Sequence, residues 1–392
     1  MKNTKSILFI SFFFEPDLSA GSFRNTSLFK EILKTKDKNV KIHVITTTPN
    51  RYKDYEVKSN TQNVNDEDFI IERVKITQRK GLLGQTISFN KYFFSVLHKT
   101  WNNDYDVVYA STSKLFSGFL GATISVFKRA KLYLDIRDIF RETIQDMFSN
   151  KHIGTLVIIP LKVIEYVTCK RAIHINLITP GFRSYFNIYK KPTYSCYTNG
   201  IDQAFIKAKK SNVKPNISMN KIVYAGNIGF GQGLEKVIPQ AAQRLGEKWE
   251  FHIYGAGNSK NLLQKKISKL QVKNVILHKA IQRERLLEVY DSADFLFMHL
   301  NNLKAFERAL PSKLFESATY GNPIIARVTS TAATFINKNI KNVILFKPCD
   351  FENLVKKLLD YKYVIEDRKD FLEAFSRQKI NRRMAKSILD LL

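Results

Sequence analysis

The segment ERALPSKLFESATYGNPIIA, residues 307–326, holds residue types well suited to bind a phosphate. Pro311 is favoured in the first turn of a helix, where its missing N–H costs nothing. The free amides at such a helix start, together with the positive end of the helix dipole, attract an anion. Ser312 and Lys313 follow directly, and Lys313 adds a full positive charge. Glu316 lies one turn further on, where it would either accept hydrogen bonds from a sugar diol or simply complement the helix dipole.

Two glycine-rich turns follow strand-like segments in the same half of the chain. VYAGNIGFGQGLEKVI, residues 223–238, runs from a strand pattern through four glycines into a helical pattern, and FHIYGAGNSKNLL, residues 251–263, has the same design. Glycine lets a backbone approach a phosphate closely. The spacing is not that of a dinucleotide fingerprint, so either turn can also be a tight connection without a ligand. The candidate donor-binding residues here are Gly226, Gly255 and Gly257, with Lys279 at the end of the next strand pattern.

A further candidate segment, DLSAGSFRN at residues 17–25, joins the first apolar run to a helix. Gly21 would allow close backbone approach to a ligand, and Ser22 would cap the helix. Arg24 would add positive charge beside a diphosphate. The alternative is an ordinary capped helix with a surface arginine.

Another strand pattern ends in DIRD, which contains Asp135, Arg137 and Asp138. Arg137 and Asp138 would either bind sugar hydroxyls or pair with each other as a salt bridge. Asp135 and Asp138 are three residues apart on a strand, so their side chains point to opposite faces. This geometry disfavours the carboxylate pair of a glycoside hydrolase.

The elements that position these residues form two series of apolar runs, each run followed by an amphipathic stretch. Such alternation predicts an α/β chain with two doubly wound, Rossmann-like domains, whose ligands bind at the carboxyl ends of the strands in a cleft between them. Residues 203–220 are rich in Lys, contain a Pro and lack apolar periodicity, which suggests a linker. The expected domains are residues 1–202 and 221–377, with the last helix, about 378–392, packing back on the first domain.

The composition restricts the class of partner. The chain has 392 residues and a formal net charge of +28, which favours anionic membrane surfaces, with nucleic acid as a less favoured rival and a compositional bias as the neutral alternative. Segments 88–101 and 152–175 mix aromatic residues with Lys, as interfacial helices do, although an inter-domain core helix would also explain the second. No run reaches the roughly 20 apolar residues needed to span a bilayer. We therefore expect a cytoplasmic protein that associates peripherally with the inner face of the plasma membrane.

Four motifs of the second half, in the order AGNIGFGQG, YGAG, HKAIQRERLLEVYDSAD and PSKLFESATYGNPII, resemble the nucleotide-sugar-binding domain of retaining glycosyltransferases of the GT-B fold, family GT4. The resemblance implies that residues 221–377 bind the nucleotide sugar and residues 1–202 the acceptor. The segments FEPDLSAGSFRN, DIRDIF and PSKLFES are most similar to the fucosaminyltransferase-like branch that builds O-antigen and capsule repeat units. The resemblance implies that Glu316 holds the donor ribose, and that the loop of Ser312, Lys313 and Leu314 meets the donor diphosphate. It also implies that DLSAGSFRN is the glycine loop beside the donor phosphate and the acceptor.

The sequence departs from the family pattern at three positions. Asn227 and Gln232 stand where many members carry an Arg and a Lys for the diphosphate, and Arg308 replaces the first Glu of the family's paired glutamates. Either Arg308 or Lys313 would then supply the missing positive charge. Arg137 and Asp138 stand near a family His that contacts the transferred sugar.

The resemblance implies a retaining hexosyl- or N-acetylhexosaminyltransferase that uses no cofactor and no metal. Its donor would be a nucleoside-diphosphate sugar, by family habit UDP-linked, and its acceptor a polyprenyl-diphosphate-linked saccharide. A nucleotide-sugar epimerase on the same scaffold and a non-enzymatic polyanion-binding protein are the alternatives. Nucleic acid is not an expected partner of the enzyme.

Overall fold

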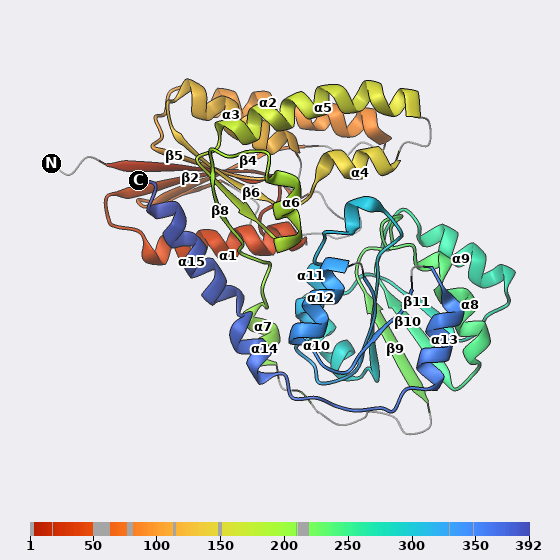
Figure 1. Cartoon of the computed structure of the whole chain (residues 1–392). Helices are drawn as coiled ribbons and strands as arrows, with labels where there is room; N and C mark the ends of the chain where they lie inside the picture. The colour runs from red at the N-terminus through yellow and green to blue at the C-terminus, as the bar shows by residue number, and fades with distance from the viewer. Residues whose placement is uncertain are drawn as a thin grey trace. The chain divides into compact units, whose positions relative to one another are not determined.

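The computed structural model describes residues 4–17, 19–49, 63–76, 81–112, 115–147, 151–208, 210, 219–328, 330–347 and 349–392. The chain divides into two compact units, one of residues 1–199 with 377–392 and one of residues 200–376 (Figure 1). Each unit is an open sheet with helices on both faces. The predicted α/β class with two doubly wound units is therefore confirmed.

The sheet of the first unit has the strand order β3-β4-β2-β1-β5-β6-β7-β8 and is parallel except for the β3–β4 pair. Its strands follow the apolar runs, because a parallel strand covered on both faces needs apolar side chains on both. The strands are β1 (Lys5–Ile10), β2 (Val40–Thr47), β3 (Val64–Asn65), β4 (Phe69–Val74), β5 (Val107–Ser111), β6 (Lys131–Ile136), β7 (His174–Leu177) and β8 (Thr193–Ser195).

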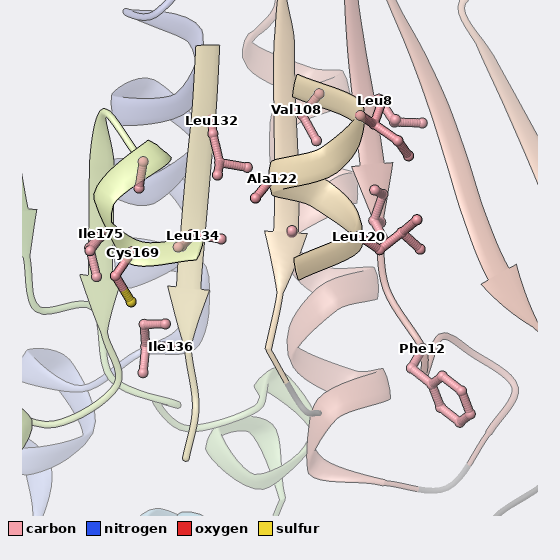
Figure 2. Packing of buried hydrophobic residues seen from close by; sticks show 14 of the residues in the cluster. Leu8, Phe12, Val108, Leu120, Ala122, Leu132, Leu134, Ile136, Cys169 and Ile175 are labelled. Atoms are coloured by element: carbon pink, nitrogen blue, oxygen red, sulfur yellow. The ribbon is translucent and has the colours of Figure 1, made fainter. Parts of the chain in front are cut away.

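Helices α2, α3 and α5 cover one face of this sheet, and α1 and α15 cover the other (Figure 1). Successive strand residues serve opposite faces, so that Leu132 and Leu134 pack under α3 and α5 while Tyr133 packs toward α15 (Figure 2). The helices of this unit are α1 (Ala20–Thr35), α2 (Gly81–Thr100), α3 (Leu115–Phe127), α4 (Phe140–Met147), α5 (Lys151–Arg171), α6 (Arg183–Phe186) and α15 (Arg377–Leu389), with a 3-10 turn, η1 (Pro180–Phe182).

Helix α5 runs without interruption through Pro160. Helix α3 lies very close to β5, because a Cβ on Gly121 would stand 2.6 Å from the Ala110 Cβ. A larger residue at position 121 would therefore push the helix off the sheet.

The second unit has a fully parallel sheet in the order β11-β10-β9-β12-β13-β14. Its strands are β9 (Asn220–Ala225), β10 (Trp249–Tyr254), β11 (Val275–His278), β12 (Phe295–His299), β13 (Ile324–Arg327) and β14 (Val343–Leu345). Its helices are α7 (Gln203–Lys207), α8 (Ile238–Leu245), α9 (Lys260–Lys269), α10 (Arg283–Asp291), α11 (Ser312–Ser317), α12 (Ser330–Asn339), α13 (Phe351–Leu359) and α14 (Lys369–Ala374), with 3-10 turns η2 (Leu234–Lys236) and η3 (Lys304–Phe306). The strand order reverses between β9 and β12, and ligands of such sheets bind at that switch point.

The boundary between the units differs from the expected one. The segment predicted as a linker, 203–220, begins with α7, and Phe205 of that helix is fully buried in the core of the second unit. A short amphipathic helix was missed there because only five residues form it. Residues 209 and 211–218 of the predicted linker lie outside the described residues. The chain returns to the first unit at Arg377, and α15 packs there with Met384, Ala385 and Ile388 buried against β1 and α1.

Candidate functional site

Two loops meet at the switch point of the second unit, residues 226–233 after β9 and the residues after β12. Asn301 joins them: its amide N–H donates to the Gly231 carbonyl at 2.8 Å, and its Nδ2 donates to the Phe230 carbonyl at 3.0 Å. Lys236 Nζ donates to Asn301 Oδ1 at 2.9 Å. A single asparagine therefore fixes the glycine-rich loop against the end of β12.

Lys313 lies in the first turn of α11 and points to the end of β9. Its Nζ lies 3.4 Å from the centroid of the Tyr224 ring, a cation–π contact. Gly226 makes room for it, since a Cβ at that position would stand 2.6 Å from Nζ. Burial lowers the pKa of Lys313 to about 7, although nearby Glu316 acts in the opposite direction. Within the described part of the chain Lys313 forms no ion pair, so an incoming anion would be its counter-ion.

Asn227 and Gln232, the two departures from the family's basic pair, bind each other. Asn227 Nδ2 donates to Gln232 Oε1 at 2.7 Å, and the Gly229 amide donates to the same oxygen at 3.3 Å. Tyr224 closes the turn, because its hydroxyl donates to the Asn227 carbonyl at 2.5 Å. The loop is thus held in shape by neutral groups. Of the two lysines beside it, Lys236 is bound to Asn301, and Lys313 rests on the Tyr224 ring.

Gly255 and Gly257 follow β10, and their missing side chains are explained by packing. A Cβ on Gly255 would collide with the Gly226 carbonyl oxygen, and a Cβ on Gly257 with the Ile228 backbone. The two loops are also joined by a hydrogen bond from the Ser259 amide to the Ile228 carbonyl at 3.0 Å. The structure therefore supports the alternative of a tight connection for this turn.

Glu316, the predicted ribose ligand, lies on α11 with its Oε1 3.8 Å from a guanidinium nitrogen of Arg283. Arg283 also pairs with Asp202 at 3.0 Å, so the Glu316 carboxylate shares its cation. The side chain of Glu316 keeps 22% of its surface exposed. It can therefore still accept hydrogen bonds from a ligand.

The other predicted residues of the second unit differ in their exposure. Ser312 and Arg308 are half-buried near the start of α11, and Lys279 is exposed. The predicted amide contact of Leu314 is corrected, because its side chain is fully buried and its N–H donates to the Pro311 carbonyl at 3.1 Å. Lys313 is thus the residue of the PSKL segment best placed for an anion.

In the first unit, the prediction for Arg24 is wrong. Its guanidinium is fully buried and forms two hydrogen bonds of 3.0 Å with Asp135, one from Nε to Oδ2 and one from NH2 to Oδ1. NH1 donates to the Thr198 carbonyl at 2.6 Å. A side chain with these partners is not available to a phosphate. The sequence alone did not reveal this pairing, because Asp135 lies 111 positions away on β6.

The capping prediction for Ser22 is also corrected. The N-cap of α1 is Ser19, whose hydroxyl accepts from the Ser22 amide at 3.1 Å. Ser22 itself is a fully buried helical residue, and Gly21 is buried beside it. Helix α1 therefore begins three residues earlier than expected.

Arg137 and Asp138 lie at the carboxyl end of β6. The Arg137 amide donates to Thr112 Oγ1 at 3.2 Å, and NH1 of its guanidinium is buried without a hydrogen-bond partner in the described chain. Burial lowers the pKa of Arg137, with Asp135 and Asp138 acting against that effect. Asp135 is buried on β6, whereas Asp138 is exposed in the loop after the strand, so the expectation of opposite strand faces does not apply to it. These two carboxylates do not form a hydrolytic pair.

Sequence analysis missed three residues that shape the site: Tyr224, Asn301 and Arg327. Arg327, at the end of β13, is 1% exposed and donates to the Asn301 carbonyl at 3.0 Å and to Asn302 Oδ1 at 3.1 Å. Each of the three lies at or just after the carboxyl end of a strand, where ligands of such sheets bind, so the strand pattern could have pointed to them. Their partners, however, are set only by the fold.

Residues 205–381 match the family model described as glycosyl transferases group 1. No curated protein matches the chain. Three similar solved structures are Anabaena HepE in complex with UDP and glucose, sucrose-phosphate synthase from Thermosynechococcus elongatus, and WaaG, a glycosyltransferase involved in lipopolysaccharide biosynthesis.

These likenesses extend over both units. HepE is 14% identical with a TM-score of 0.67, over 98% of this chain and 99% of that one. The synthase is 13% identical with a TM-score of 0.65, over 98% and 95%, and WaaG is 13% identical with a TM-score of 0.61, over 97% and 95%. The chain therefore has the GT-B fold, and its residues 205–381 match the model of the glycosyl transferases group 1 family.

Proposed function

We propose that this chain is a retaining glycosyltransferase. It moves a hexosyl or N-acetylhexosaminyl group from a UDP-sugar to a lipid-linked saccharide during assembly of O-antigen or capsule. The observation that carries the proposal is Lys313, a half-buried lysine that forms no ion pair in the described chain, at the switch point of the segment that matches the group 1 model. UDP is favoured because the HepE structure contains UDP and glucose.

The chemistry needs positive charge where the diphosphate departs, because negative charge develops there in the transition state. Lys313 meets this need at the end of β9, next to the glycine turn. The family's usual pair of cations is replaced at 227 and 232 by two amides that bind each other. In this proposal Lys313 takes over their role, Arg308 assists it, and Glu316 accepts the hydroxyls of the ribose.

Residues of the first unit serve the acceptor and the transferred sugar in this proposal. Arg137 and Asp138 are the candidates, because the buried guanidinium nitrogen without a partner and the exposed carboxylate both lie at the carboxyl end of β6. Such a pair suits sugar hydroxyls, to which one residue donates and from which the other accepts.

A lipid-linked acceptor places the enzyme at a membrane surface. Among the described residues, no helix is long and apolar enough to cross a bilayer. The net charge of +28 suits the anionic inner face of the plasma membrane, to which the enzyme would bind peripherally. WaaG and WaaB, which are similar in fold, are described as lipopolysaccharide glycosyltransferases, which supports a surface saccharide as acceptor.

The test has two stages. A thermal-shift screen against a panel of nucleotide sugars should show stabilisation by one donor, because a ligand that binds only the folded state stabilises it by mass action. Turnover is then measured with that donor and polyprenyl-diphosphate saccharides, and the anomeric configuration of the product is determined. Lys313→Ala and Glu316→Ala should each reduce transfer, whereas Lys269→Ala, at an exposed position of α9, should not.

Each other result has a definite meaning. Stereochemical scrambling of the donor without an acceptor would favour the epimerase. Full activity of Glu316→Ala would remove that residue from the site. Absence of stabilisation by any nucleotide sugar would overturn the proposal.

A further inference from the structure

The outer surface of the first unit carries several large apolar side chains that are largely exposed. We use the term outer helical face for the exposed side chains of α2, α3 and α5 and of the residue that follows α2. Phe94, Trp101 and Phe127 are 67%, 73% and 73% exposed. Soluble surfaces expose single apolar residues routinely, but a concentration of large ones marks an interaction site.

On α2 the exposed apolar residues form one stripe. Ile87, Phe94 and Trp101 are spaced by seven residues, which puts them on the same side of the helix. Lys91 and His98 lie on the same stripe and are also exposed. The buried side of the helix, with Phe89, Tyr92 and Val96, packs on the sheet. The exposed aromatic residues are therefore additional to those that the core requires.

Helices α3 and α5 continue this surface. On α5, Ile159, Val163 and Val167 are exposed at intervals of four residues, with Lys162 and Lys170 beside them. On α3, Val126 and Phe127 are exposed at the carboxyl end. This alternation of apolar groups and Lys is typical of helices that lie in a lipid interface. The apolar side chains and the lysine methylenes then lie among the acyl chains, and the lysine charges lie among the headgroups.

The three helices form one layer. Helix α3 packs against both α2 and α5 (Figure 1). The rings of Phe93 and Phe119 stack at 6.2 Å between α2 and α3, and Lys128 Nζ donates to the Trp101 carbonyl at 2.6 Å, which joins the ends of these helices. A Cβ on Gly118 would stand 3.3 Å from Thr168 of α5. The exposed apolar residues therefore belong to neighbouring helices of one layer.

The exposed charges on α2 and α5 named above are lysines, whereas Asp104 at the rim is a fully exposed acid. Glu165 of α5 is buried, where its carboxylate accepts from the Tyr185 hydroxyl at 2.8 Å and lies 3.4 Å from Arg141. Asp104, at the rim, lies 3.8 Å from Lys128. Cations and aromatic rings thus remain exposed. A symmetric dimer through this face would place like patches together, lysine against lysine, whereas an anionic bilayer complements both features.

We propose that the outer helical face docks this chain on an anionic lipid bilayer. The docking deepens the proposed function, because it brings the enzyme to a lipid-linked acceptor, but it is observable without turnover. Trp101 and the ends of α2 and α3 insert into the interface, and the lysines meet the headgroups.

The chain contains its own probe for this proposal. It has two tryptophans, Trp101 at 73% exposure in the outer helical face and Trp249 at 7% in the core of the second unit. Vesicles of phosphatidylcholine with phosphatidylglycerol should shift the emission of Trp101 to the blue, and brominated lipid should quench it. The shift should persist in Trp249→Phe, disappear in Trp101→Phe, and weaken with added salt.

A variant pair tests the surface itself. Phe94→Ser with Phe127→Ser should weaken partition into these vesicles at least about tenfold, because two interfacial aromatic groups are lost. The matched control is Leu359→Ser, which removes a side chain of 63% exposure from the second unit and should bind vesicles as the parent does. A parental circular-dichroism spectrum and a cooperative thermal unfolding transition show that the variant is folded.

The outcomes separate this proposal from the proposed function. Three results would overturn the docking surface. The double variant could bind vesicles as the parent does, or the parent could bind pure phosphatidylcholine equally well. The chain could also form a concentration-dependent dimer that buries Trp101 in the absence of lipid. A chain that docks but binds no nucleotide sugar would leave the docking surface intact and remove the proposed function.

Discussion

The ammonium of Lys313 on α11 rests against the face of Tyr224 on β9, with 3.4 Å between Nζ and the ring centroid. A ring face stabilises a cation less than a carboxylate or water does, so burial brings the pKa of this lysine down to about 7. Its charge therefore depends on whether an anion is present. A diphosphate beside Nζ would favour the protonated form, which couples donor binding to proton uptake.

We expect the affinity for a nucleotide sugar to fall as the pH rises through about 7, because Lys313 loses its proton in this range. Lys313→Met should weaken binding about tenfold to a hundredfold at neutral pH, the usual effect of losing a charged hydrogen bond, and should make it independent of pH. Lys313→Arg keeps its charge throughout and should also show a flat profile. Isothermal titration calorimetry in buffers of different ionisation enthalpy measures both the affinity and the protons taken up.

The lowered pKa of Lys313 also makes the free energy of unfolding depend on pH. Because the pKa of Lys313 is lower in the folded chain than its ordinary value of 10.5, the unfolded chain binds the extra proton between about 7 and that value. The contribution of this group to stability therefore rises with pH above about 7, and Lys313→Met should remove the rise. A parental pH profile in that variant would show that the lysine is not desolvated.

Gly226 is expected to be required for the position of Lys313. An alanine there would place its Cβ 2.6 Å from Nζ, and the backbone has a φ of +148°. We expect Gly226→Ala to lower the free energy of unfolding by about 1–2 kcal/mol and to weaken nucleotide-sugar binding, measured by denaturant unfolding and calorimetry.

Gly246 provides the matched control for this change. Its φ is +71°, also in the region that favours glycine, but a Cβ there would meet nothing within 4 Å. Gly246→Ala should therefore cost stability without loss of donor affinity. If both variants bind the donor as the parent does, Gly226 has no role in placing the lysine.

The sequence was sufficient for what depends on local pattern. Long apolar runs separated by amphipathic stretches identified the strands around Phe9 and Phe297, because a strand buried on both faces admits little else. The PSKLFES segment likewise located Lys313, since helix starts have their own residue preferences. Arg24 shows the limit: the same residue suits a phosphate or a buried carboxylate, and its partner Asp135 comes from β6. Gly255 was ambiguous for the same reason, because close backbone packing and ligand approach both require glycine.

Restoring the family's cation at position 232 should compensate for the loss of Lys313. Gln232 lies beside Asn227 in the glycine-rich loop, with 2.7 Å between its Oε1 and Nδ2 of that residue. In the Lys313→Met background, Gln232→Lys should raise nucleotide-sugar affinity by about tenfold, because a charged donor replaces a neutral acceptor. Calorimetry at low and at high salt measures the gain, which should shrink with salt.

The control for this rescue is Lys269→Ala combined with Gln232→Lys, in which Lys313 is still present. There a second cation should add less than it does when Lys313 is missing, because the diphosphate already has a partner. Equal gains in both backgrounds would mean that positions 232 and 313 do not serve the same group.

The ion pair of Arg24 and Asp135 is expected to stabilise the first unit rather than to bind the donor. Both side chains are fully buried, so removing one leaves the other charge without its partner. Arg24→Met or Asp135→Asn should lower the free energy of unfolding by about 3–5 kcal/mol at neutral pH. Lys30→Met, which breaks the exposed 3.4 Å pair with Glu15, should cost less than about 1 kcal/mol in the same urea titration.

The pH dependence of the buried pair has a definite sign. Burial acts to raise the pKa of Asp135, but Arg24 and its other partners outweigh it, so the pKa is lower than the ordinary 3.8. The stability that this carboxylate contributes is present above that ordinary value and is lost as the pH falls through the lowered one. The deficit of Asp135→Asn should therefore shrink in acid. A loss of nucleotide-sugar affinity in Arg24→Met, with parental stability, would instead return Arg24 to the donor site for which its position in DLSAGSFRN first suggested it.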